Sequence, residues 1–85
     1  MASQKTIEVK VLNQKGVVYA GACQILFVPA KKEEVAILPY HTPLILLLQP
    51  GEVSVVVDGD RRKISTITGG IVYVGENTAS VLITT

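Results

Sequence analysis

The sequence predicts an all-β fold, a small antiparallel β-sandwich or flattened barrel of short strands. Short apolar segments recur with turn residues roughly every eight to twelve positions, which is typical of such folds. No segment has the periodicity of a long helix. Without crossover helices a parallel βαβ fold is excluded, and stacking or closing the sheets would hide the edges of many short strands.

Length and composition predict one folded domain, residues 1–85, because a chain of 85 residues supports a single compact core at most. Apolar residues make up 48% and charged residues 18%, which is far from the composition of a disordered chain. The net charge of +1 provides no field to attract nucleic acid, so nucleic acid is not expected as a partner.

The single cysteine excludes an intrachain disulfide and argues against zinc or iron–sulfur sites, so no metal and no cofactor are predicted. The longest uninterrupted apolar run, residues 44–48, cannot cross a bilayer, and residues 1–6 contain no apolar targeting stretch. We expect a soluble chain in a reducing, cytosolic compartment, without direct membrane insertion.

The first strands are predicted from alternation and from turn residues. Residues 6–12 alternate apolar and charged side chains, which indicates a half-buried strand. A turn at 13–16 leads into a short strand at 17–19, which Gly21 is expected to end. A longer strand follows at 22–28.

Parity assigns the faces of that longer strand. Cys23, Ile25 and Phe27 fall on one side, where the cysteine is expected to be a small buried hydrophobe, and Pro29 ends the strand. A charged loop at 31–34 then precedes a third apolar segment.

That segment, residues 35–38, runs into a corner that contains the only histidine, His41, between Pro39 and Pro43. The next strand, residues 44–48, is apolar at every position. A sandwich strand has one face in water, so a strand with two apolar faces needs cover from something outside its own sheet.

The C-terminal half is predicted as hairpins. Residues 52–58 turn back through Asp58 and Gly59 into a strand at 60–68. Because Ile64 and Ile67 have opposite parity, a bulge or a two-sided environment is expected in the returning strand.

Two further strands, 71–74 and 79–84, are expected after a break at Gly69–Gly70 and a turn at 75–77. Pro50 and Gly51 fit a type II turn before the hairpin. The predicted structural turn residues are Pro39, Pro43, Pro50, Gly51, Asp58, Gly59, Gly69 and Gly70.

No catalytic residues are predicted. His41 has no identifiable partner by spacing, and Glu33 and Glu34 are neighbours that would point to opposite faces of an extended chain. A corner-stabilising or partner-contacting histidine is the favoured interpretation. Composition and spacing therefore favour a binding or structural role.

Four ordered motifs resemble one known family. Residues 34–44, EVAILPYHTPL, are similar to its G-E-hydrophobic-G-hydrophobic-hydrophobic-P-x-H-A/T-P-L stretch, and further matches are VYAG at 18–21, LQPG at 48–51 and TGGIVYV at 68–74. On these motifs the chain resembles the N-terminal β-sandwich domain of the epsilon subunit of F-type ATP synthase, called delta in mitochondria. Glu33 and Ala36 replace two glycines of the family pattern.

The resemblance implies a non-catalytic rotor subunit in the central stalk of a proton- or sodium-translocating F-type ATP synthase. Such a subunit binds the gamma subunit and the c-ring, couples ion translocation to ATP synthesis, and lies on the cytoplasmic side, peripheral to the inner (plasma) membrane. The implied c-ring contacts are Glu34, Tyr40, His41 and Thr42. The expected contacts with gamma or another partner are Leu44, Leu46 and Leu48, the apolar strand that needs cover.

The family usually continues into a C-terminal pair of helices that carries inhibition of ATP hydrolysis and, in some members, an ATP site. This chain ends at Thr85, after the last predicted strand, so neither function and no bound nucleotide is expected. Two alternatives remain open: a free-standing homo-oligomeric β-sandwich module without a rotor role, and a small enzyme that uses His41 with Glu34.

Overall fold

The computed structural model describes residues 5–85. Residues 1–4 lie outside the described residues; they belong to the predicted domain and to the N-terminal stretch in which no targeting segment was predicted. Within the described range the chain is all-β, without a helix, as predicted. The strands are β1 (Ile7–Asn13), β2 (Gly16–Cys23), β3 (Ile25–Pro29), β4 (Glu34–Ile37), β5 (Leu44–Leu48), β6 (Gly51–Val57), β7 (Asp60–Ile67), β8 (Gly69–Val74) and β9 (Thr78–Thr84). Over these residues no helix could span a membrane.

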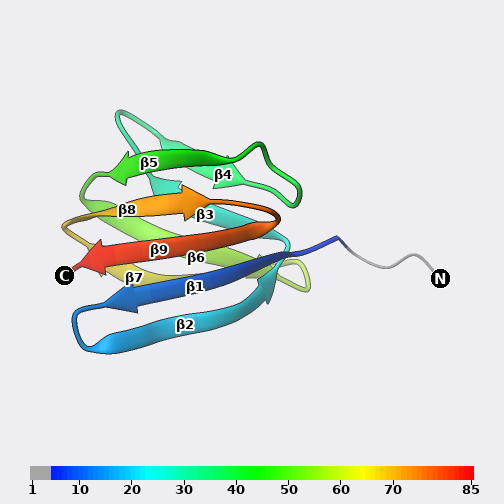
Figure 1. Cartoon of the computed structure of the whole chain (residues 1–85). Coiled ribbons are helices and arrows are strands. Elements are labelled where there is room, and N and C mark those ends of the chain that lie inside the picture. Colours follow the sequence, from blue (N-terminus) through cyan, green and yellow to red (C-terminus); the bar gives the residue numbers. More distant parts are fainter. Residues whose placement is uncertain (1–4) are drawn as a thin grey trace.

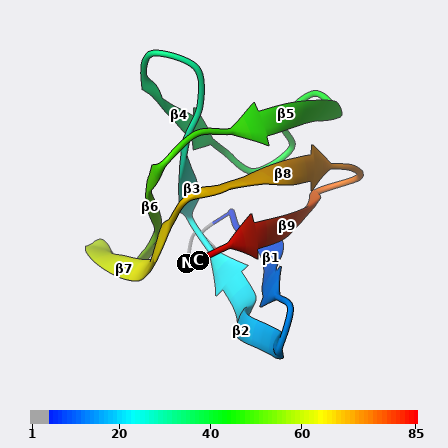
Figure 2. The ribbon, with the colours of Figure 1, turned by 90° about the vertical axis from the view of Figure 1, so that its left-hand side faces the viewer.

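The strands form two stacked sheets, which confirms the sandwich. The five-stranded sheet has the order β2-β1-β9-β8-β5 and the four-stranded sheet the order β4-β3-β6-β7. Figure 1 shows the first sheet in front of the second, and Figure 2 shows β5, β8 and β9 to the right of β6 and β7. Neighbouring strands are antiparallel except β1 and β9, which pair in parallel.

The core lies between the sheets and consists of alternate residues of their strands. In β1 the inward side chains are Ile7, Val9 and Val11, as the alternation predicts. They pack with side chains from both sheets, among them Leu26, Ile37, Val55, Val72 and Val81.

The β6–β7 hairpin confirms two predictions. Asp58 and Gly59 form the two-residue turn, with φ of 51° and 81°, as turns of this type require. In the ladder Val53 faces Ser65 and Ser54 faces Lys63, so Ile64 is an extra residue in β7. This is the bulge that the parity of the two isoleucines predicts.

The prediction for residues 17–28 is wrong in two respects. Gly21 does not end the second strand, because β2 continues to Cys23 and the chain changes sheet at Gln24. That change resets the parity, so the buried residues of β3 are Leu26 and Val28 rather than Ile25 and Phe27. Cys23 is buried as expected, but from β2.

Two glycine predictions also need correction. Gly51 does not have a positive φ, so the turn after Pro50 is not type II; glycine is needed there because a Cβ atom would lie 2.7 Å from Cβ of Pro29. The break predicted at Gly69–Gly70 falls at Thr68, where the chain changes sheet, and the two glycines begin β8. Gly70, with φ of 154°, lets β8 approach β9 closely, since a Cβ atom would lie 2.3 Å from the carbonyl oxygen of Leu82.

Candidate docking surfaces

The edge strand β5 has one inner and one outer apolar side, as the continuous apolar run indicated. Leu44 and Leu46 are partly buried against the core and Leu48 is only 5% exposed. The outward side chains are instead Ile45 and Leu47, which are 62% and 70% exposed. The three leucines expected at a partner therefore have little exposed surface, and the outward side chains of β5 are the two residues between them.

The exposed side chains of β5 continue across the sheet. Leu47 lies opposite Ile71 of β8, which lies opposite Leu82 of β9, and Ile45 lies opposite Tyr73. All five side chains are exposed. We call this surface the outer apolar face; it comprises Ile45, Leu47, Ile71, Tyr73 and Leu82.

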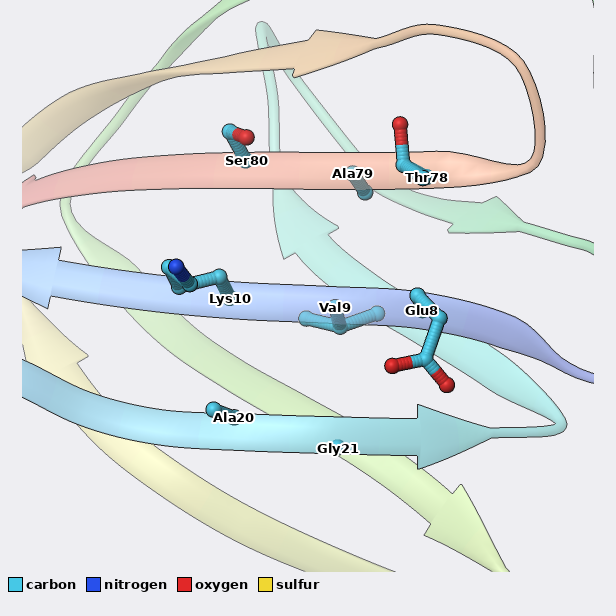
Figure 3. A pocket seen from close by; sticks show the side chains of 8 residues that line it. All are labelled: Glu8, Val9, Lys10, Ala20, Gly21, Thr78, Ala79 and Ser80. Atoms are coloured by element: carbon cyan, nitrogen blue, oxygen red, sulfur yellow. The ribbon is translucent and has the colours of Figure 1, made fainter.

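A shallow hollow of about 350 Å³ lies on the same side of the sheet, over β1, β2 and β9 (Figure 3). Its lining includes Ala20, Gly21 and Ser80, and Glu8 and Lys10 are its two charged residues. Small side chains of β2 and β9 therefore make up much of its lining.

The corner, residues 38–43, joins β4 to β5 at the end of the sandwich where β8 turns into β9 (Figure 1). Tyr40 is 68% exposed and has a left-handed backbone, with φ of 61°. Its N–H donates a hydrogen bond to Oδ1 of Asn77, at 2.8 Å, from the β8–β9 turn. The corner is thereby connected to a segment 37 residues away in the sequence.

Glu34 begins β4, whereas the corner follows the end of that strand, so Glu34 lies apart from Tyr40, His41 and Thr42. The Glu34 carboxylate forms an ion pair with Arg61 of β7. The Arg61 guanidinium in turn lies 4.0 Å from the ring centroid of Phe27. Of the four residues expected to contact the c-ring, the structure therefore brings Tyr40, His41 and Thr42 together and separates Glu34 from them.

A groove of about 510 Å³ runs between the edge strands β4 and β5. Val35, Leu46 and Leu47 give it an apolar lining, and Lys31 and Glu33 of the charged loop also line it. The groove thus connects the outer apolar face with the charged loop that precedes Glu34.

The potentially reactive side chains His41 and Cys23 are held in structural roles. Nδ1 of His41 lies 2.8 Å from the carbonyl oxygen of Thr42, to which its N–H can donate. Burial raises the pKa of the Cys23 thiol to about 11, with the Glu8 carboxylate as a smaller cause, so the nucleophilic thiolate is disfavoured. Within residues 5–85 no group of three or more potential metal ligands occurs.

Sequence reasoning missed the three residues that define these surfaces best: Ile45, Leu47 and Asn77. Alternation along β5 gives Ile45 and Leu47 as the outward residues once Leu48 is known to be buried, but the sequence does not show that burial. Asn77 carried one signal, because asparagine in a turn tolerates a left-handed backbone, and its φ is 48°.

Comparisons with known proteins identify the fold and the family. Residues 6–85 match the family model described as "ATP synthase, Delta/Epsilon chain, beta-sandwich domain". The chain is 34% identical over 77 residues to the ATP synthase epsilon chain of Acinetobacter baumannii (strain AYE), covering 91% of this chain and 55% of the relative. The epsilon chain of Acidithiobacillus ferridurans is also 34% identical over 77 residues, covering 91% of this chain and 54% of that relative.

Two solved structures share the fold at 16% sequence identity. A chain of the Euglena gracilis mitochondrial ATP synthase superposes with a TM-score of 0.84, covering 100% of this chain and 54% of that one. A chain of the Tetrahymena thermophila mitochondrial ATP synthase central stalk/c-ring superposes with a TM-score of 0.76, covering 99% and 67%. The present chain spans about half the length of the curated relatives it matches. Through its β-sandwich domain, this chain belongs to the family of ATP synthase delta/epsilon chains.

Proposed function

We propose that this chain is a non-catalytic rotor subunit of the central stalk of a proton- or sodium-translocating F-type ATP synthase. It would bind the gamma subunit and the c-ring and so couple ion translocation to ATP synthesis, peripheral to the membrane. Family membership and the stalk origin of a structural neighbour support this proposal. The observation that carries it is the outer apolar face, which a subunit docked in an assembly would have covered.

We assign the gamma contact to the outer apolar face together with the corner. The strand β5 directly follows the corner, and Tyr40 and Leu38 add exposed apolar surface at that end of the strand. An apolar area of this kind suits a lasting contact with a stalk protein better than contact with polar loops. The proposal therefore assigns to the gamma contact three residues for which the family resemblance implied a c-ring contact: Tyr40, His41 and Thr42.

We assign the c-ring contact to the charged end that holds Glu34. The loop between β3 and β4 exposes Lys31, Lys32 and Glu33 beside it. Charged side chains provide orientation and specificity against the polar loops that the family resemblance implies for the ring. Transmission of torque needs a stiff body, and a sandwich with proline-fixed corners provides one.

The test is titration of the 85-residue chain with the matching gamma subunit by calorimetry. Leu47→Glu should weaken binding by roughly thirtyfold or more, the effect of losing a central apolar contact. It should leave the unfolding midpoint nearly unchanged, because Leu47 is mostly exposed. Ala36→Glu is the matched control, since Ala36 is exposed on the outer side of the other sheet, opposite Phe27.

No complex at tens of micromolar, roughly −6 to −7 kcal/mol, would overturn the rotor proposal. The same apolar face also supports the alternative of a homo-oligomeric module. In that case sedimentation would show concentration-dependent association of the isolated chain, which Leu47→Glu abolishes. The enzyme alternative gains no support, because neither the hollow nor the groove described above includes His41.

A further inference from the structure

Asn77 connects three segments that are far apart in the sequence. Its side-chain Oδ1 accepts the Tyr40 N–H at 2.8 Å, and its Nδ2 donates to the Thr6 carbonyl oxygen at 2.8 Å. Its own carbonyl oxygen accepts the N–H of Glu8 at 3.2 Å. The Asn77 amide is therefore held on one side by the segment leading into β1 and holds the corner on the other.

The backbone at both ends of the Asn77–Tyr40 bond is left-handed, with φ of 48° and 61°. Asparagine adopts this conformation readily, whereas it is uncommon for a bulky residue such as tyrosine. A tyrosine keeps such a backbone only when its surroundings determine it. The hydrogen bond from the Tyr40 N–H to Asn77 is the contact that can hold this backbone.

The rest of the corner has few ties of its own. In the part of the chain that the structure describes, the other side-chain hydrogen bond of the corner is local, between His41 and Thr42. The Tyr40 ring is largely exposed, so core packing does not fix its direction. Among the described residues, the Asn77 side chain therefore links the backbone at Tyr40 to a distant segment by a hydrogen bond.

We propose that Asn77 is a positioning residue, which holds the corner in the shape that it presents to the stalk partner without touching that partner itself. This inference rests on the proposed function, because it adds a determinant to the gamma contact. It assigns the β8–β9 turn a role in recognition, through Tyr40, that neither its sequence nor its own exposure indicates.

Two substitutions separate the side chain of Asn77 from its backbone. Asn77→Gly keeps the left-handed backbone, which glycine adopts freely, and removes both amide hydrogen bonds. Asn77→Asp keeps an oxygen that can accept the Tyr40 N–H and loses only the donor to Thr6. Glu76→Gly is the matched control, since it loosens the same turn and leaves the amide in place.

The experiment combines gamma binding with hydrogen exchange of the Tyr40 amide in the full chain. For Asn77→Gly we expect faster exchange of that amide and about three- to tenfold weaker binding, equivalent to one hydrogen bond. Asn77→Asp should restore both quantities to near the parent values, which a general loss of stability would not explain. Glu76→Gly should change neither by more than about twofold.

Three results would overturn the inference. If Asn77→Gly speeds the exchange of the Tyr40 amide but binds gamma normally, while Leu47→Glu still weakens binding, the rotor proposal stands and the role of Asn77 in recognition is refuted. If exchange of the Tyr40 amide is unchanged in Asn77→Gly, Asn77 does not hold the corner. If the parent chain binds no gamma subunit, the recognition role falls together with the proposed function.

Discussion

The two outer surfaces of the sandwich are built differently. On the four-stranded sheet Arg61 lies over Phe27 and pairs with Glu34, and Lys63 lies 3.7 Å from Glu52. Ser54 is only 2% exposed although its neighbours in the strand, the inward-facing valines 53 and 55, point to the other side. This surface is therefore covered by its own long side chains.

The five-stranded sheet lacks such a cover. Its outer apolar face leaves five large side chains exposed on neighbouring strands, and the charged Glu8 and Lys10 lie on β1, in the lining of the hollow. A domain this small could cover either face with charged side chains that lie flat, as Arg61 does. The two faces therefore differ in how much large apolar surface they leave open to water.

The largest expected effect concerns the sheet that carries the outer apolar face. Gly70→Ala places a Cβ atom against the β9 backbone at a strained φ, so we expect a loss of about 3 kcal/mol or more in the free energy of unfolding. Urea denaturation measures it. Gly59→Ala is the control, because its Cβ would meet nothing within 4 Å and only the backbone cost of about 1 kcal/mol applies. Equal losses would show that β8 does not require the close approach.

An intermediate effect is expected when the covered face is opened. Arg61→Ala removes an ion pair that is nearly half exposed and a cation–π contact, so we expect a loss of about 1 kcal/mol, smaller at high salt. It should also expose Phe27 and raise the binding of a hydrophobic dye, making this face more like the other. Lys63→Ala, which breaks only the looser pair with Glu52, should do neither. A dye signal that does not change would contradict the covering role of Arg61.

The smallest effect at neutral pH concerns the interior between the two faces. Burial raises the pKa of the Cys23 thiol from 9.0 to about 11, so the unfolded chain loses this proton at lower pH than the folded chain. The free energy of unfolding should therefore decline as pH rises from about 9 to about 11, by at most about 2–3 kcal/mol, and Cys23→Ser should reduce this decline. A thiol reagent at pH 8 should react with the chain only after denaturation. Rapid reaction of the folded chain would show that the interior opens easily.

Local patterns in the sequence determined the class of fold and most of the strands. The alternation in β1, the Asp58–Gly59 hairpin and the bulge at Ile64 depend on short-range sterics and on burial of every second residue, and these can be read without knowing the partner strand. The family motifs around the corner were equally local. The two apolar sides of β5 were visible as well, in its continuous apolar run.

Tertiary structure decided which side chains of β5 face outward, because parity becomes a direction only once the strand is placed beside β8. It decided the faces of β3, because the chain changes sheet at Gln24 and resets the count. It also separated Glu34 from the corner, and it brought Asn77 to Tyr40 across 37 residues of sequence. The sequence specifies contacts between near neighbours through steric rules, whereas contacts between distant segments depend on how the sheets stack, which no local pattern contains.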